Sequence, residues 1–214
     1  MKRYTVLIFL LLGHTSFAQF SLEALIGTSL NMSIHRQYVS QINGPNFIAE
    51  THLAGGGLEV GFGGRLGFND QLSFGLGLAY QYKGHEGNYI KSAYKNRTNS
   101  KYWFHLLVLP IDAQYTLPNQ IGLHVGMEIA TILAPWFNNT FLFYQNKAMA
   151  AALTGISYTK GRFRVELFYK HYFTPYMRQT IYLNNSNNDP VEFSDYNRFH
   201  DIQLRIAVRL FSLN

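Results

Sequence analysis

The chain contains 214 residues, with 18 Lys and Arg, 12 Asp and Glu, a formal net charge of +6 and no Cys. Its mean hydropathy is −0.08, and after residue 18 no stretch approaches the ~20 apolar residues that a membrane-spanning helix requires. These values exclude a helical membrane protein, a disulfide framework and thiol chemistry. The net charge is also too small to indicate a nucleic-acid partner.

The first 18 residues have the pattern of a secretory signal peptide. Two basic residues near the start precede an apolar run from Val6 to Leu12, and small and polar residues follow up to Ala18. The run is too short for a transmembrane anchor, so we expect cleavage after Ala18. Residues 19–214 then form a single barrel domain with a formal net charge of +4, because the cut removes two of the 18 basic residues and none of the acidic ones.

Beyond residue 18, apolar and polar residues alternate with period two in about eight short segments, the pattern of half-buried β-strands. In residues 72–83, Leu, Phe and Tyr fill the even positions, and Ser, Gly, Ala, Gln and Lys fill the odd ones. We predict strands at residues 20–34, 54–68, 72–83, 102–117, 121–130, 148–158, 163–173 and 200–210. Aromatic residues make up 16% of the chain, which suits a barrel wall with aromatic girdles at both membrane interfaces.

The connections between these segments alternate in length. Residues 69–71, 117–120 and 159–162 are short turns, whereas 35–53, 84–101, 134–147 and 174–197 are long and polar. Short periplasmic turns and long extracellular loops are typical of outer-membrane barrels. The sequence therefore predicts an all-β fold: a transmembrane antiparallel up-and-down β-barrel of about eight strands, of the OmpA-like kind. A soluble barrel or sandwich is the alternative, and it would turn the apolar faces inward.

Two local features refine this prediction. The residues that begin the strand 102–117 fit the opposite phase from those that follow, which indicates a β-bulge near Leu106. Aromatic residues gather where strands meet connections. We expect an outer girdle of Tyr102, Trp103, Phe104, Trp136, Phe137, Tyr172, Phe173 and Tyr176, and an inner girdle of Phe20, Tyr115, Tyr158, Phe163 and Phe211.

The polar face of the strands carries charges of both signs. With about eight strands, the lumen is only wide enough to be filled by side chains, and an unpaired charge there would be costly. We therefore expect a barrel-interior charge network that holds the barrel closed. Its predicted members are Glu23, Glu59, Arg65, Asp112, Glu128, Arg164, Glu166, Lys170, Arg205 and Arg209, with Lys83 and Asp201 on the same face.

Two histidines occupy positions where an imidazole could take part in chemistry. His124 and Glu128 lie four residues apart on one strand face, but a metal would need further ligands that the sequence does not mark. His171 lies on the apolar face near a long connection, where a catalytic residue of an outer-membrane lipid hydrolase could lie. No Ser or carboxylate partner follows from its spacing, so we interpret His171 as part of the aromatic girdle. No catalytic, metal or cofactor site is predicted.

Several segments resemble the PorT-like outer-membrane β-barrel proteins of Bacteroidetes. The similar features are the leader ending at Ala18 and Gln19, the Gly-rich hairpin from Leu72, the strand 107–115 with its internal Pro, and a strand ending at Tyr158 before a tight turn. Two residues before this Pro, where the family often has Glu, the chain has Val108. The resemblance implies an outer-membrane location and, for some members, a part in type IX protein secretion. It carries over no catalytic residue.

These observations predict an integral protein of the Gram-negative outer membrane with a structural or interaction role, accessory to protein secretion or surface assembly. The expected partners are outer-membrane lipid and, through the extracellular loops, other outer-membrane or secretion components. Two alternatives stay open at this point. An outer-membrane enzyme would need His with Ser, Asp or Glu converging at the extracellular rim, and a small pore would need a lumen without the charge network.

Overall fold

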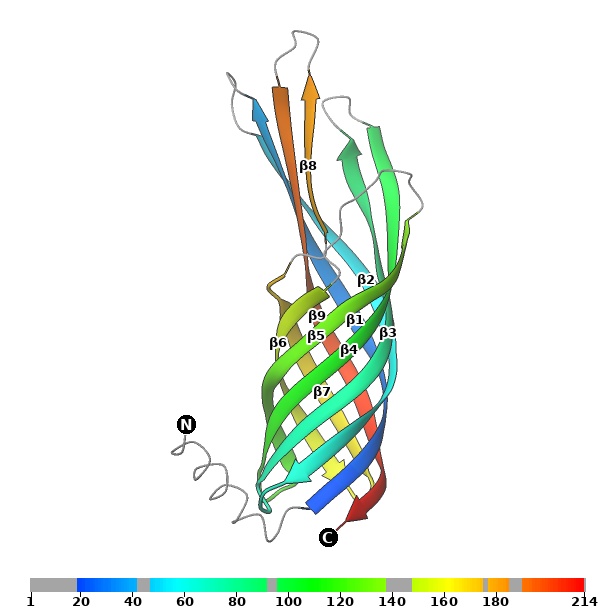
Figure 1. The fold of residues 1–214 in the computed structure, drawn as a ribbon, viewed down its shortest axis with the longest axis vertical. Helices are drawn as coiled ribbons and strands as arrows, with labels where there is room; N and C mark the ends of the chain where they lie inside the picture. Colours follow the sequence, from blue (N-terminus) through cyan, green and yellow to red (C-terminus); the bar gives the residue numbers. More distant parts are fainter. Residues whose placement is uncertain are drawn as a thin grey trace, which may run out of the picture.

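The computed structural model describes residues 19–41, 47–91, 96–137, 148–174, 177–184 and 190–213, and the predicted signal peptide lies outside them. These residues form nine strands (Figure 1): β1 (Gln19–Gln41), β2 (Phe47–Gly67), β3 (Leu72–Lys91), β4 (Asn96–Thr116), β5 (Ile121–Phe137), β6 (Ala148–Lys160), β7 (Phe163–Tyr172), β8 (Met177–Asn184) and β9 (Pro190–Leu213). Within this part of the chain, no helix has the length and apolar character needed to cross a membrane.

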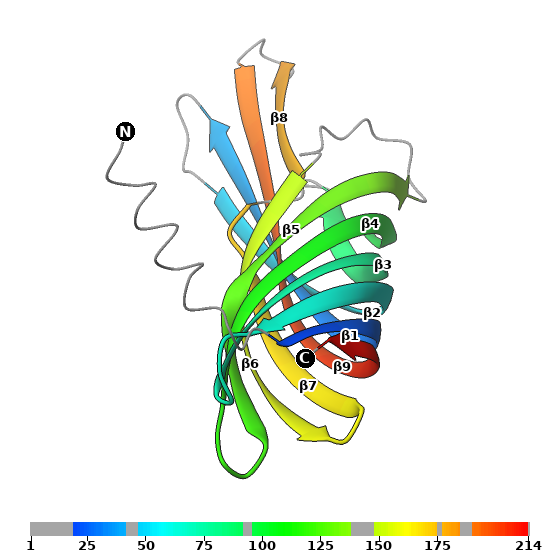
Figure 2. The same ribbon diagram turned by 60° about the horizontal axis from the view of Figure 1, so that its bottom comes forward.

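The strands close into an antiparallel barrel. Each of β1 to β7 pairs with the next strand, β7 pairs with β9, and β9 pairs with β1, so that both ends of the barrel chain lie side by side (Figure 2). β8 extends the line of β7, because β9 pairs with β7 along residues 200–208 and with β8 along residues 190–197. The nine-stranded sheet therefore has eight positions around the wall, and the predicted all-β up-and-down barrel is confirmed.

The barrel is apolar outside and polar inside. On β2, Leu58 and Val60 are 65% and 57% exposed, whereas Glu59 between them is 3% exposed. The same alternation runs along β7, where every second residue from Arg164 to Tyr172 is buried. A soluble barrel would bury its apolar faces and expose its charges. The soluble alternative is therefore wrong for this chain.

Some of the aromatic residues predicted for the two girdles lie on the outer wall, and others point into the lumen. All predicted members of the inner girdle are exposed on the outer wall, namely Phe20, Tyr115, Tyr158, Phe163 and Phe211. In the outer girdle, Phe173 is exposed and Trp103 stacks on Tyr82 with ring centroids 5.0 Å apart. Phe104 and Tyr172 were wrongly assigned, because both side chains point into the lumen and are fully buried. The side chains of Tyr102, Trp136, Phe137 and Tyr176 lie outside the described ones.

Much of what the sequence presents as long loops is paired strand. The β1–β2 pairing continues to Val39 and Phe47, the β3–β4 pairing continues to Lys91 and Asn96, and β8 and β9 pair up to Pro190. In Figure 1 these hairpins rise well above the closed part of the barrel. The prediction failed here because segments without an apolar face give no amphipathic signal, although their backbones continue the ladder.

The bulge expected near Leu106 is present, but its extra residue lies on the neighbouring strand. In the β4–β5 pairing, His105 faces Ala134 and Leu106 faces Ile132, which leaves Leu133 of β5 without a partner. The phase of β4 itself is unbroken, with Phe104, Leu106 and Val108 all pointing inward. The change of phase in the sequence thus reflects an apolar layer in the lumen. This layer contains Ala79, Phe104, Leu106, Val108, Ala130, Met149, Ala151, Tyr172 and Phe199.

Two inward glycines differ in the space around them and give a test of the packing. A Cβ on Gly126 would lie 2.1 Å from the carbonyl oxygen of Ile111, whereas a Cβ on Gly63 would have its nearest neighbours at 3.5 Å. We expect Gly126→Ala to destabilise the barrel by about 1–3 kcal/mol, because a backbone atom of β4 cannot move aside cheaply. Gly63→Ala is the control. The measurement is the urea midpoint of heat-modifiable gel mobility, and equal midpoints would contradict the expected packing.

Candidate functional site: the ion-pair network in the lumen

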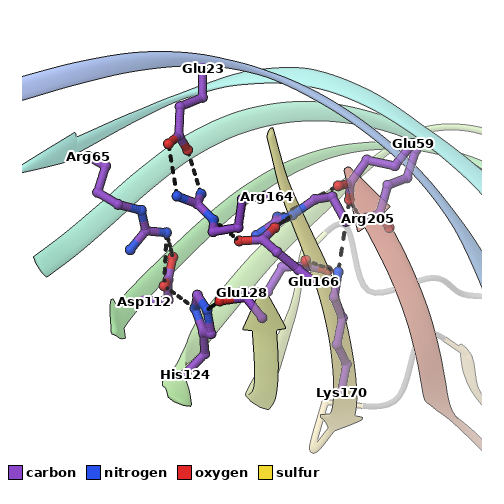
Figure 3. Close-up of polar contacts among 12 residues, drawn as sticks. Glu23, Glu59, Arg65, Asp112, His124, Glu128, Arg164, Glu166, Lys170 and Arg205 are labelled. Atoms are coloured by element: carbon purple, nitrogen blue, oxygen red, sulfur yellow. Dashed lines mark hydrogen bonds and ion pairs between the residues drawn. The ribbon is translucent and has the colours of Figure 1, made fainter. Parts of the chain in front are cut away.

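Charged side chains from β1, β2, β4, β5, β7 and β9 meet in the lumen (Figure 3). They lie there because the polar positions of each strand alternate with the outward apolar ones. We call the following residues the lumen network: Glu23, Glu59, Arg65, Asp112, Glu128, Arg164, Glu166, Lys170 and Arg205. All are buried, with at most 8% exposure, and all take part in ion pairs.

One chain of ion pairs runs from β1 through β7 and β9 to β2. Arg164 donates to both carboxylate oxygens of Glu23, at 2.8 and 2.5 Å, and its Nε donates to Glu166 Oε1 at 2.8 Å. Glu166 Oε2 accepts from Arg205 Nε, and Arg205 Nη1 lies 3.7 Å from Glu59 Oε1. Arg164 and Glu166 come from β7 and Arg205 from β9, so this chain joins four neighbouring strands of the wall, β7, β9, β1 and β2 (Figure 3).

A second group lies around Lys170. Its Nζ donates to Glu128 and lies 3.9 Å from Glu59 Oε2, while the hydroxyl of Tyr172 also donates to Glu128. Lys83, also predicted on this face, pairs with Asp201 at 2.5 Å and donates to the Tyr172 hydroxyl at 3.0 Å. Tyr172 thus joins the charged part of the lumen to the apolar layer.

A third group contains a hydrogen-bond chain that the sequence did not reveal. Arg65 Nη2 donates to both oxygens of Asp112, at 3.2 and 3.1 Å. His124 Nδ1 lies 2.8 Å from Asp112 Oδ2, and His124 Nε2 lies 2.8 Å from Ser157 Oγ. These residues come from β2, β4, β5 and β6, and only the register of those strands brings them together. The signal available in the sequence was their common inward phase.

The Asp112, His124 and Ser157 contacts have the order found in serine hydrolases, where an acid orients the imidazole that activates the serine. In this chain Ser157 is only 4% exposed and His124 only 3%. Asp112 is also shared with Arg65. A lumen cavity that borders Asp112 has neither His124 nor Ser157 in its lining. The arrangement therefore gives a substrate no access to the serine hydroxyl, and we interpret it as part of the structural network.

The remaining predicted residues are separated by the fold. His124 and Glu128 share a strand face, but His124 contacts Asp112 and Ser157 whereas Glu128 contacts Lys170 and Tyr172. Arg209 is only partly buried. The β1–β9 register places Arg209 directly opposite Glu23, in the inward phase, but its Nε atom has no hydrogen-bond partner among the described residues. His171 lies on the outer wall and contacts His200.

A cavity in the charged part of the lumen is small. A cavity lined by Glu23, Arg65, Asp112, Arg164, Arg205 and a wall of Gly and Leu has a volume of about 20 Å³, enough for roughly one water molecule. The apolar layer closes the lumen further along the barrel axis. The described lumen thus contains the charge network that the small-pore alternative had to lack.

Glu166 gives the sharpest test of the network, because its carboxylate is fully buried between Arg164 and Arg205. We expect Glu166→Gln to destabilise the barrel by about 3–5 kcal/mol, since the change leaves two buried guanidinium groups without their shared anion. The exposed turn residue Asp70 provides the control Asp70→Asn. Urea midpoints of heat-modifiable mobility that agree between Glu166→Gln and the control would remove the stabilising role assigned to the network.

No protein-family model matches the chain, and no curated protein does. Several solved structures have a similar fold. Neisserial surface protein A has a TM-score of 0.44 and 11% identity, with 86% of this chain and 97% of that chain covered. OprG from Pseudomonas aeruginosa has a TM-score of 0.47 and 10% identity, with 87% of this chain and 96% of that chain covered. Ail from Yersinia pestis has a TM-score of 0.35 and 12% identity, with 86% of this chain and 99% of that chain covered. At these identities and TM-scores the likeness carries no functional argument, and the barrel described above rests on the chain's own strand pairing.

Proposed function

We propose that this chain is an integral outer-membrane β-barrel protein with a structural or interaction role, accessory to protein secretion or surface assembly. The observation that carries the proposal is the outer wall. Large apolar side chains are exposed on β1 to β7 and on β9, for example Phe62 at 61% and Val125 at 66%, whereas the lumen network is buried. An exposed apolar band of this extent fits the hydrocarbon core of a bilayer.

The closure of the barrel also supports an outer-membrane location. In a bilayer, backbone N–H and C=O groups have no water to bond with, and only helices and closed barrels satisfy them. The pairing of β1 with β9 removes the free edges of the sheet in the closed part of this chain. The predicted signal peptide at residues 1–18 provides the route of export. Lipid is then the first partner of this protein, along the whole apolar wall.

The interaction role is supported by what lies beyond the apolar wall. A strand needs only about 9–11 residues to cross the bilayer, whereas β1, β2, β4 and β9 contain 23, 21, 21 and 24 residues. The excess forms the projecting hairpins in Figure 1. Because the lumen is filled, contacts with other molecules are made by these hairpins and the outer wall. The resemblance to PorT-like proteins supports secretion or surface assembly as the process concerned.

The described side chains near the extracellular rim give the enzyme alternative no support. Among the described residues, its best candidate His171 contacts the imidazole of His200 rather than a Ser or carboxylate. The Asp112, His124 and Ser157 chain lies near the short turns at the opposite end of the barrel and is buried. We propose that the protein is not an enzyme.

The membrane location predicts the effect of a charge on the outer wall. Val60 is 57% exposed near the middle of the closed wall. We expect Val60→Arg to cost about 2–4 kcal/mol and to reduce the folded barrel recovered from membranes, because the charge would face hydrocarbon. In a water-soluble barrel the same change at an exposed position would be neutral. Asp70→Arg in the short turn is the control, and unchanged recovery of Val60→Arg would contradict the membrane location.

The interaction role is tested by mild-detergent extraction of native outer membranes, pull-down of the tagged protein and identification of the chains that co-purify. We expect stoichiometric recovery of secretion or surface-assembly components. Replacing residues 177–196 by a short turn removes the β8–β9 hairpin above the wall, since Met177 pairs with Asn197. Replacing residues 88–99 removes the matching part of the β3–β4 hairpin, since Gly87 pairs with Ser100.

Both shortened proteins keep the closed wall. Loss of the partners from at least one of them would locate the binding surface on that hairpin. A barrel that is recovered alone from wild-type membranes would contradict the interaction role.

A further inference from the structure

Three side chains with metal-binding atoms meet on the outer wall near the end of β7. His171 and His200 are direct cross-strand partners in the β7–β9 pairing, and their Nδ1 atoms lie 3.2 Å apart. The Tyr169 hydroxyl, two residues earlier on the same face of β7, lies 2.9 Å from the same His200 nitrogen. Tyr169 is 43% exposed, and both imidazoles are partly exposed. The group is accessible from outside the barrel and lies apart from the lumen network.

Hydrogen bonds alone do not satisfy the three polar atoms of this group well. The His200 Nδ1 atom has two polar neighbours, His171 Nδ1 and Tyr169 Oη. An imidazole nitrogen carries either one N–H or one in-plane lone pair, so it makes one well-directed hydrogen bond and not two. A metal ion removes the conflict, because all three atoms can act together as lone-pair donors to one cation.

The spacing of the two nitrogens also suits a metal. Zinc binds imidazole nitrogen at about 2.0–2.1 Å and prefers tetrahedral geometry. Two ligands at about that distance and separated by 3.2 Å subtend an angle of roughly 100° at the ion, close to the tetrahedral value. The two imidazoles therefore need no rearrangement of the strands to receive the ion.

From these contacts we propose that Tyr169, His171 and His200 form a surface site for a zinc or copper ion. Imidazole suits both metals, and the phenol oxygen supplies the third donor. The described residues contain no group of three or more His, Cys, Asp or Glu side chains that could hold a metal, so the phenol is essential to this site. The bound ion joins β7 to β9 just below β8, where the projecting hairpin begins (Figure 1).

One further observation favours copper over zinc at this site. Met32 of β1 is the cross-strand partner of His200 on its other side, and its side chain is 46% exposed on the outer wall. Thioether sulfur is a soft ligand that favours reduced copper over zinc. A row of Met32, His200 and His171 across three adjacent strands thus offers the donor types that a copper site uses.

A second aromatic–imidazole cluster on the wall provides a matched control. The Tyr80 hydroxyl contacts His105 Nδ1, but the next ring beside His105 is Tyr82, with centroids 5.0 Å apart, and not a second imidazole. His105 therefore has a phenol partner without the paired nitrogen. If metal binding were due to isolated surface imidazoles, replacing His105 and replacing His171 would weaken metal binding equally.

The test is isothermal titration of the purified barrel in detergent, carrying a tag without histidine, with Zn²⁺ and with Cu²⁺ alone. We expect one equivalent of metal to bind the wild type. His171→Phe and His200→Phe keep an aromatic ring in the girdle and should each weaken binding at least tenfold, whereas His105→Phe should bind as the wild type does. Heat-modifiable mobility confirms that each variant is folded.

Tyr169→Phe tests the third donor separately. With Cu²⁺, the wild type should show a phenolate-to-copper charge-transfer absorption that this variant lacks. Wild-type protein that binds neither metal, His171→Phe and His200→Phe proteins that bind as tightly as wild type, or an equal loss in His105→Phe would each overturn the proposal. Binding with no difference between wild type and Tyr169→Phe in either affinity or absorption would also overturn the three-donor site.

Discussion

The requirement that every backbone N–H and C=O group in the wall be paired governs the rest of this structure. In hydrocarbon, an unpaired group costs several kcal/mol, and the β1–β9 pairing meets the requirement by closing the sheet on itself. Closure with eight positions around the wall makes the lumen narrow. The outward positions of each strand can then be apolar, and the inward positions must pack against one another across a small space.

The composition of the lumen follows from that narrow space. Small residues bring strands close together, as at Gly126, where the β4 backbone leaves no room for a side chain. Charges are retained only in pairs: Glu166 lies between Arg164 and Arg205, and Lys170 contacts Glu128. Phe104, Leu106 and Tyr172 fill the lumen beyond the charged part. A barrel filled in this way offers its outer wall and projecting hairpins, rather than its interior, for contacts with other molecules.

The sequence was a good guide wherever alternation was the physical signal. Glu59, between the exposed Leu58 and Val60, could be assigned to the lumen from period two alone, and most of the charge network was found in this way. The same rule failed for Phe104 and Tyr172, which are apolar or aromatic yet point inward, since alternation by polarity cannot distinguish an apolar lumen layer from an apolar outer wall. Alternation also placed Arg209 in the inward phase, and the register puts it opposite Glu23, but alternation could not reveal that its Nε atom has no hydrogen-bond partner within the described part of the chain.

The sequence by itself determined the fold class, the inward or outward side of most wall residues and the end of the barrel at which the short turns lie. These depend on local periodicity, and periodicity is written along one strand. Only the tertiary structure decided which charges pair, that Asp112, His124 and Ser157 form one hydrogen-bond chain, and that His171 faces His200. Each of these contacts joins residues from different strands. Their proximity therefore depends on register and closure, which no single strand encodes.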